Sequence, residues 1–482
     1  MGYFDSIKAF TAEQVVKAMV NSLRNSSDES IMRLTYLAEK LTPIEYYRDQ
    51  IRGLRQMFEE KRPQIVLARR VLQEIHPNVR RKLIENLICK SILLGVPKRQ
   101  KIEKELGCQV PMFFVVSPSM RCNLNCYGCY AGEYRKESDM PIELLDRIFT
   151  EANELGMNFL TISGGEPFLR KEQIDLMEKH SELSFQVYTN GTLIDRDMAK
   201  RLAQMGNVYP AISVEGYEAE TDARRGKGTY KKIMNAMEAL RDEGALFGFS
   251  ITATRHNTEL VCSDEFMDGL INKGVSFGWY FTYVPIGKKP DINLMPTPEQ
   301  RLHLRNQVHH LRYDKPIFIG DFWNDGPYVG GCIAGGRRYF HINNAGDVEP
   351  CVFCHFTVDN IKNKSLKEAF SSPFFRAIQE NQPYDNNLMR PCMLIDVPEV
   401  LRDTVEKYGA RPSHEGADSL IKELKDDIDK YSQAFKELSD PFWEENYKGT
   451  IYYKDYKTER KEYLDKLKEA PTPKSQKEKA KV

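Results

Sequence analysis

The fold is decided by "MFFVVSPSMRCNLNCYGCYAGEY", residues 112 to 134, in which an apolar run leads into a loop with Cys122, Cys126 and Cys129. The stretch holds neither a histidine nor a fourth cysteine. Three thiolates leave a tetrahedral structural zinc site incomplete. They can hold a 4Fe-4S cube with one iron that lacks a protein ligand. An open coordination position at iron indicates chemistry rather than a purely structural metal site.

The apolar run at 112 to 117 is the first of six. The others, rich in β-branched and aromatic residues, lie at 158–163, 184–189, 208–214, 246–254 and 276–284. Helix-like segments separate them, and the one that begins at Tyr230 closes at Gly244, as a helix stop would. Strands that alternate with helices predict parallel pairing through right-handed crossovers. Six units are fewer than the eight of a closed barrel. The predicted fold class is therefore α/β, a partial (β/α)6 TIM-type barrel.

Unusual residues follow four successive strands of this predicted barrel. After the three-cysteine loop come "SGGEP" (163–167), "TNGT" (189–192) and "SVEG" (213–216). In barrels of this kind the loops after the strands share one face, where functional groups gather. We therefore expect these four loops to converge on a single site.

The chain divides into four predicted parts. Residues 1–108 are a helical, basic N-terminal region, and residues 109–320 are the partial barrel. Residues 321–400 carry Cys332, Cys351, Cys354 and Cys392 without clear periodicity. Residues 401–482 are charged and helical, and end in "APTPKSQKEKAKV", a tail that we expect to be disordered.

Composition narrows the class of protein. Of the 482 residues, 41% are hydrophobic and 29% charged, as in soluble globular proteins. Basic and acidic residues balance at 69 each, so no nucleic-acid partner is expected. We find no apolar run of 18 residues and no signal pattern, and expect a cytoplasmic protein with reduced cysteines.

One local charge imbalance stands out. Between Lys61 and Lys101 lie eleven Lys or Arg residues against two acids, Glu74 and Glu85. A solvated helical face is one interpretation. The other is a surface that binds an anionic lipid or acidic partner, which would give the protein a peripheral membrane contact.

Cys-x-x-x-Cys-x-x-Cys after the first strand of a β/α barrel resembles the radical S-adenosylmethionine (radical SAM) superfamily. The resemblance covers roughly residues 110 to 395. It implies that the open iron of a 4Fe-4S cluster binds S-adenosylmethionine (SAM). An electron from the reduced cluster would then cleave SAM to a 5'-deoxyadenosyl radical, which abstracts hydrogen from an unactivated carbon.

The resemblance also assigns roles to the loops. "GGEP" is similar to the family's methionine-binding motif, in which glycines let the backbone approach the ligand and a glutamate receives the ammonium group. "SVEG" with "TDARRGKGTY" (221–230) is similar to peptide-modifying and sulfatase-maturing members, in which a serine and an arginine hold the carboxylate. The implied SAM contacts are Gly164, Gly165, Glu166, Ser213 and Arg225, with Asn190 and Glu215 as further candidates near the nucleoside.

One position departs from the family pattern. Family members often carry an aromatic residue directly before the third cysteine, whereas here that residue is Gly128, flanked by Tyr127 and Tyr130. This departure concerns the adenine contact and leaves the three cluster cysteines in place.

The second cysteine set resembles the start of the SPASM extension, in its shortened twitch form, which binds auxiliary 4Fe-4S clusters. The four cysteines named above can fully ligate one such cluster. Four thiolates are also a zinc set, and Cys-x-x-Cys alone does not decide between the two. A cluster with an open iron is a third possibility.

The expected protein is a radical SAM enzyme with a low-potential electron donor, a flavodoxin or ferredoxin. Resemblance to SPASM proteins favours a peptide substrate, and the basic helices favour a lipid or other anionic substrate. A non-enzymatic iron-sulfur electron carrier is the alternative of another class. The catalytic base is open, with Asp321, Asp347 and Glu349 as acids near the second cysteine set.

Overall fold

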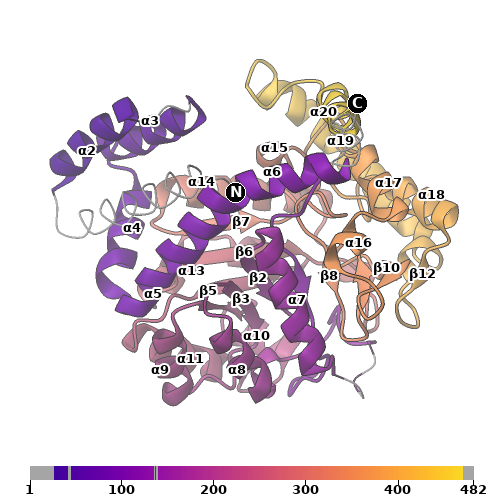
Figure 1. Cartoon of the computed structure of the whole chain (residues 1–482). Helices are drawn as coiled ribbons and strands as arrows, with labels where there is room; N and C mark the ends of the chain where they lie inside the picture. Colours follow the sequence, from indigo (N-terminus) through magenta and orange to yellow (C-terminus); the bar gives the residue numbers. More distant parts are fainter. Residues whose placement is uncertain (1–26, 42–44, 135, 137–138, 470–482) are drawn as a thin grey trace.

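The computed structural model describes residues 27–41, 45–134, 136 and 139–469. The tail at 470–482, for which the sequence predicts disorder, lies outside these residues. Figure 1 shows a sheet surrounded by helices, with the α2 and α3 pair set apart from the body and the C-terminal helices packed against it.

A ten-stranded sheet with the order β11-β9-β8-β1-β2-β3-β4-β5-β6-β7 organises the described chain. Its strands are β1 (Val115–Val116), β2 (Phe159–Ile162), β3 (Ser184–Thr189), β4 (Val208–Ser213), β5 (Gly248–Ala253), β6 (Phe277–Thr282), β7 (Phe318–Asp321), β8 (His341–Ile342), β9 (Asp347–Glu349) and β11 (Asp359–Asn360). Strands β1 to β7 pair in parallel, each with the next. This is the partial, open barrel that the sequence predicts.

The sheet extends beyond the six predicted units at both ends. Strand β7 adds a seventh parallel strand beside β6, and β8 pairs in parallel with the other edge, at β1. The apolar part of β7 is only "FIG", which is too short to stand out as a run. Strand β8 has two residues and depends on pairing with β1 rather than on its own pattern. The cysteine-rich region is thus partly built onto the barrel sheet.

Helices cross between the barrel strands, as the alternating pattern predicts. They are α7 (Ile142–Leu155), α8 (Lys171–Lys179), α9 (Arg196–Met205), α10 (Glu218–Arg225), α11 (Thr229–Asp242), α12 (Thr258–Val261), α13 (Asp264–Asn272) and α14 (Pro298–Asp314), with the 3-10 turns η2 (Pro167–Leu169) and η3 (Ile292–Leu294). Helix α11 ends two residues before Gly244, whose φ of 70° is left-handed. Helix α14 begins with a capping box between Thr297 and Gln300.

The helices of the described N-terminal region precede β1, and those from α4 onward lie against the barrel at the end opposite the loops that follow the strands. They are α2 (Asp28–Leu41), α3 (Glu45–Glu59), α4 (Pro63–Glu74), α5 (Pro77–Lys82), the π-helix η1 (Leu83–Leu94) and α6 (Gly95–Leu106). Backbone and side-chain hydrogen bonds fix them there: His76 N–H donates to Gly244 O, and Asn78 donates to Gln204 O. They reach the ends of α11 and α9.

Four residues of the basic stretch bind the C-terminal ends of further barrel helices. Arg70 donates to Val275 O at 2.7 Å after α13, and Lys82 to Ser181 O at 2.6 Å after α8. Lys98 and Arg99 donate to carbonyls at the end of α7. Carbonyls at a helix C-terminus lack helical partners and carry partial negative charge, so cations suit them. These four side chains therefore help to attach the N-terminal region to the barrel.

The C-terminal part packs beside the barrel, and its helix α19 contacts α14. Its elements are α15 (Gly326–Val329), β10 (Phe356–Thr357), α16 (Leu366–Phe370), α17 (Pro373–Asn381), α18 (Pro398–Tyr408), β12 (Arg411–Pro412), η4 (Ser419–Ile421), α19 (Lys425–Tyr447) and α20 (Tyr456–Glu469). Helix α20 returns to contact α6 of the N-terminal region. Among the helices described, none has the length and apolar character needed to span a membrane.

Candidate functional site

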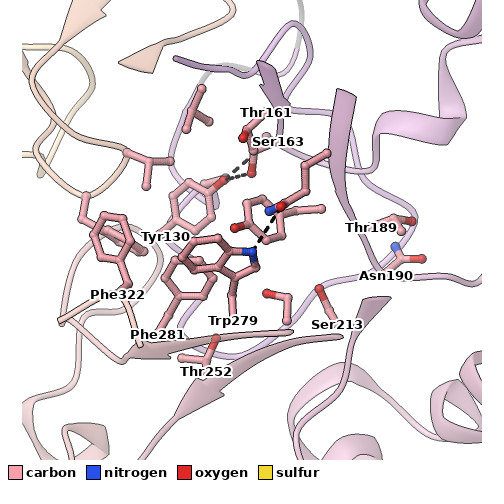
Figure 2. Close-up of a pocket in the computed structure, with 18 of the residues that line it drawn as sticks. Tyr130, Thr161, Ser163, Thr189, Asn190, Ser213, Thr252, Trp279, Phe281 and Phe322 are labelled. Carbon is pink, nitrogen blue, oxygen red and sulfur yellow. Dashed lines mark hydrogen bonds between the residues drawn. The ribbon is translucent and has the colours of Figure 1, made fainter. Parts of the chain in front are cut away.

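A cavity of about 620 Å³ lies inside the partial barrel, and we call it the lumen. Its upper wall carries residues at the ends of strands, Thr189, Ser213 and Thr282, and its lower wall carries Phe159, Phe277 and Phe318 at the starts of strands. It therefore runs the length of the barrel. Figure 2 shows aromatic side chains around its middle.

All three cysteines of the first loop line the upper lumen. Cys122 is exposed, and Cys126 and Cys129 are partly buried. The thiols lie near enough for Cys126 and Cys129 to raise the pKa of Cys122 electrostatically, in addition to a larger effect of burial. The structure thus places three thiols together at the mouth of the barrel, a donor set that fits a three-cysteine cluster.

Glycines bring the second loop against the first. An added Cβ at Gly165 would lie 2.0 Å from the carbonyl oxygen of Arg121, and one at Gly164 would lie 2.4 Å from that of Ser119. Gly164 also has a φ of 107°, which disfavours other residues. Only glycine permits this close approach, and Gly164 and Gly165 line the same cavity as the cysteines.

Glu166 joins the second loop to the third. Its buried carboxylate accepts hydrogen bonds from Phe168 N, Thr189 Oγ1 and Asn190 N, at 3.0, 2.8 and 2.8 Å. Burial raises the pKa of Glu166, although these hydrogen bonds act to lower it. The Glu166 carboxylate therefore holds the second and third loops together, in addition to the SAM contact that the resemblance implies.

Asn190 and Ser213 reach the cavity from β3 and β4. Asn190 Nδ2 donates to Asn123 Oδ1 at 2.8 Å and lies 3.8 Å from Cys122 Sγ, so it bridges the third loop to the cysteine loop. Ser213 is the last residue of β4 and lines the upper lumen (Figure 2). Both candidates thus lie at the predicted face.

The fourth loop presents two arginines rather than one. Buried Glu215 accepts from Arg224 at 2.5 Å and from Arg225 through the same oxygen, Oε1. Its second oxygen, Oε2, is buried without a hydrogen-bond partner among the described residues. Both guanidinium groups line the lumen. Arg224, which the sequence analysis did not single out, belongs to the site as much as Arg225.

Tyr283 occupies the space beside Gly128. A Cβ added at Gly128 would lie 2.8 Å from the Tyr283 ring, and Gly128 has a φ of 64°. An aromatic side chain at position 128 is therefore sterically excluded, and the end of β6 supplies an aromatic ring to this side of the lumen instead. A tyrosine at the end of a predicted strand was the only signal for this residue in the sequence.

The second cysteine set gathers beside the lumen wall. Cys351 and Cys354 face each other in an isolated β-bridge, and Tyr339 OH lies 2.7 Å from Cys351 Sγ. Cys332 and Cys392 interact electrostatically with each other and with Cys351. Four cysteines, two of them partly buried and two buried, thus come together from three separate segments.

These four thiols suit either of two groups. A single zinc ion binds four ligands at about 2.3 Å from one point, and a 4Fe-4S cube binds each cysteine at a different iron.

The three acids near this region do not line the lumen. Burial raises the pKa of Asp321 to about 6, and its carboxylate binds Asn324. Asp347 pairs with Arg411. Glu349 accepts from Tyr134 at 2.9 Å and pairs with His341 at 2.5 Å. All three are buried in local networks, and the structure assigns none of them to the reacting face.

Comparison with known families identifies two segments. Residues 116–259 match the radical SAM superfamily, and residues 332–393 match an iron-sulfur cluster-binding domain, SPASM. The first segment holds the cysteine loop and the three loops that converge on it. The second holds Cys332, Cys351, Cys354 and Cys392. The N-terminal helices lie outside both.

Individual relatives are distant. Fe-coproporphyrin III synthase of Methanosarcina barkeri is 27% identical over 221 residues, 43% of this chain and 55% of that relative, so the match spans about half of its length. Mycofactocin maturase MftC of Mycolicibacterium smegmatis is 28% identical over 299 residues, 58% of this chain and 75% of that relative.

Two solved structures share the fold. SuiB of Streptococcus suis bound to S-adenosylmethionine matches with a TM-score of 0.52 and 19% identity, over 62% of this chain and 76% of SuiB. SuiB bound to the precursor peptide SuiA matches with a TM-score of 0.50 and 18% identity, over 59% and 71%.

The cofactors follow from the two matched domains. They are a 4Fe-4S cluster and SAM for the first, and an auxiliary iron-sulfur cluster for the second. The exposed cysteine loop, the glycine cradle and the unpartnered oxygen of Glu215 fit this assignment. Residues 116–259 of this chain thus form a radical SAM domain, and residues 332–393 form a SPASM-type iron-sulfur domain.

Proposed function

We propose that this protein abstracts a hydrogen atom from an unactivated C–H bond of a neutral, apolar group held in the lumen. The cluster and SAM, when bound at the three-cysteine loop, supply the 5'-deoxyadenosyl radical. The observation that carries the proposal is the position of this loop: it opens directly onto a cavity lined by Tyr188, Trp279 and Phe281. A dry apolar wall protects a carbon radical from side reactions with water.

The chain's own residues have separate duties in this proposal. Cys122, Cys126 and Cys129 hold the cluster, and Cys332, Cys351, Cys354 and Cys392 hold the auxiliary one. Gly164 and Gly165 admit the methionine part of SAM. The fork of Arg225, oriented by Glu215, suits a carboxylate, as a planar guanidinium pairs with it bidentately. Ser213 and Asn190 add polar contacts from the neighbouring strand ends.

A peptide is the first candidate substrate. One similar protein, SuiB, is known in complex with a precursor peptide, and another, MftC, is named a maturase. An aliphatic or aromatic side chain of a peptide would enter the upper lumen. The reaction would then be an oxidation or a bond formation on that side chain.

A lipid or other amphiphilic small molecule is the second candidate. The observation in its favour is the apolar character of the lumen over the full length of the barrel, which a single side chain does not fill. Either substrate requires electrons at low potential, and a flavodoxin or ferredoxin is the donor that we expect.

Anaerobic formation of 5'-deoxyadenosine from SAM, with dithionite as the reductant, tests the proposed function. Cluster-loaded protein should form it, and Cys126→Ala should abolish it. The matched control is Cys262→Ala, which removes a buried thiol of a barrel helix end that donates to Thr258 O. Absence of the product from fully iron-loaded wild-type protein would refute the proposal.

The same assay separates the two substrate classes. Soluble peptides and a lipid extract from the source cells are added in parallel. Stimulation by the peptide fraction alone supports the first candidate, and stimulation by the lipid fraction alone supports the second.

A further inference from the structure

A second cavity, of about 470 Å³, lies between the N-terminal helices, the loop before β8 and α20. Four arginines line it, and we call it the arginine cavity: Arg99 of α6, Arg337 and Arg338 of the loop, and Arg460 of α20. These residues lie far apart in the sequence. The fold therefore assembles four guanidinium groups around one hollow.

None of these arginines forms an ion pair with a described residue. Arg99 and Arg337 donate only to backbone carbonyls, such as Gly156 O and Cys332 O. Arg460 donates to Gln109 and to a carbonyl, and its buried Nε has no partner. The exposed side chain of Arg338 makes no hydrogen bond that the structure shows.

The two carboxylates that line the arginine cavity are engaged elsewhere. Glu103 accepts from Val110 N and from Tyr463 OH, both at 3.1 Å. Glu459 pairs with Lys454 at 2.6 Å. Burial and the nearby charge of Arg338 lower the pKa of Arg99 and of Arg460 to about 10. Glu103 acts in the opposite direction on both pKa values and so offsets part of this charge. Four guanidinium groups against two carboxylates still leave the arginine cavity with a net positive charge, which suits an anion.

The arginine cavity and the lumen meet at Met112, which lines both. Met112 is 37% exposed, and Phe318, which lines the lower lumen, is 58% exposed. The lower end of the lumen therefore reaches the surface beside the arginines. Leu67 and Val71 of α4, with Leu83 and Leu87 of η1, form the remaining lower wall.

The lumen itself contains no charged side chain below its upper loops. Its central polar side chains are neutral, and two of them are bonded to each other, where Trp279 Nε1 donates to Gln186 at 3.1 Å (Figure 2). Burial raises the pKa of Tyr188 and Tyr209, as expected in a dry environment. A strand of six residues such as β6 spans about 20 Å. One leaflet of a bilayer core is about 15 Å thick, so an acyl chain matches this length.

We propose that the two cavities together form a binding site for an anionic amphiphile, with its acidic head group among the four arginines and its acyl chain in the lumen. The chain enters past Met112, and its far end then lies toward the three-cysteine loop. The inference rests on the proposed function only for the fate of that far end, because binding itself requires no radical chemistry.

Equilibrium dialysis under anaerobic conditions tests the site on the full, cluster-loaded chain without SAM. The probes are radiolabelled palmitate, a free fatty acid, and vesicles of phosphatidylglycerol, a membrane lipid. Hexadecanol and phosphatidylcholine vesicles are the references without net negative charge. Arg338→Glu should weaken binding of the anionic probe about tenfold or more. Binding of hexadecanol should change less than about twofold, since its head carries no charge.

A second variant tests the junction. Met112→Glu places a carboxylate where the chain must pass, and it should abolish binding of palmitate and of hexadecanol alike. Arg196→Glu, at a 70% exposed side chain of α9, is the control and should leave binding unchanged. Iron content and circular dichroism establish that each variant is folded.

The outcomes distinguish a free fatty acid from a membrane lipid as the ligand, and the binding site from the proposed function. Binding of palmitate supports a free acid as ligand, and binding of phosphatidylglycerol alone supports a membrane lipid, provided that Arg338→Glu weakens either one. Absence of binding by both anionic probes, or binding that neither variant changes, overturns the inference. Failure to form 5'-deoxyadenosine with intact palmitate binding would refute the proposed function and leave the binding site standing.

Discussion

At the scale of single residues, the site depends on side chains whose partners fix their direction. Arg225 is partly buried beside Glu215, which also binds Arg224, so both guanidinium groups line the lumen in a defined orientation. A free oxygen remains on Glu215. This arrangement fixes the orientation of the planar guanidinium group, and not only the position of its positive charge.

Arg225→Lys should therefore weaken SAM binding about tenfold, because lysine keeps the charge and loses the bidentate geometry. Anaerobic equilibrium binding of SAM to cluster-loaded protein is the measurement. Arg196→Lys, on the exposed face of α9, is the matched control. An affinity equal to that of the wild type would show that Arg225 does not hold the SAM carboxylate.

A second prediction concerns the effect of Asp321 on how the free energy of unfolding depends on pH. Burial raises its pKa to about 6 in the folded chain, above the unfolded value of about 3.9. Between these values the folded state binds more protons than the unfolded state, so stability falls as pH rises from 4 to 6. The ionised form at pH 7 thus costs about 3 kcal/mol.

Asp321→Asn should remove this cost, so the free energy of unfolding of the variant should gain on the wild type as pH rises from 4 to 7. Urea unfolding at several pH values measures the difference. Asp403→Asn, at an exposed carboxylate of α18, is the control. A difference that does not vary with pH would contradict the raised pKa.

At the scale of elements, a buried ion pair joins three segments around the second cysteine set. Arg301 of α14 donates to Asp396 at 2.5 Å, and both side chains are fully buried. The Arg301 guanidinium also lies 3.9 Å from the ring centre of Phe435 in α19. Asp396 accepts from Cys392 N at 2.9 Å. The pair therefore positions the loop that carries the fourth cysteine.

Arg301→Met should reduce the free energy of unfolding by about 3–5 kcal/mol, because it leaves a buried carboxylate without its partner. Denaturant unfolding measures this, and iron analysis should show partial loss from the second set. Arg402→Met breaks a partly exposed pair with Asp429 and should cost about 1 kcal/mol or less. Equal costs for the two variants would rule out a special role for the buried pair.

At the scale of the whole molecule, two cysteine sets occupy separate places on one sheet. The first follows β1, and the second lies on segments that join β8 and β9 to the same sheet. Their walls meet in the lumen, where Tyr130 from the first loop packs against Phe353 from the second region. Each set nevertheless draws its ligands from its own segments, so the two can be emptied separately.

Iron content checks this independence. Reconstituted wild-type protein should hold about eight irons per chain, and either Cys126→Ala or Cys392→Ala should hold about four. The Cys392 variant should keep the capacity to bind SAM, and the Cys126 variant should lose it. Zinc in place of iron at the second set of the wild type would contradict the assignment.

The sequence by itself determined the barrel, the cysteine loop and the glycine-rich loops. These depend on local signals: apolar runs of strand length, helix stops, and residue types fixed by backbone approach. Gly164 and Gly165 are examples, since any side chain there would collide with the cysteine loop. Such requirements restrict the residue type at the position itself, so they can be recognised in the sequence.

Only the tertiary structure decided what the basic stretch and the scattered arginines do. Arg99, Arg337 and Arg460 come together from three distant segments, and no local sequence pattern predicts the cavity that they line. The short strands β7 and β8 were missed for the same reason, because their pairing partners rather than their own residues make them strands. Contacts between segments far apart in the chain depend on how the whole molecule packs, and a single sequence does not display that packing.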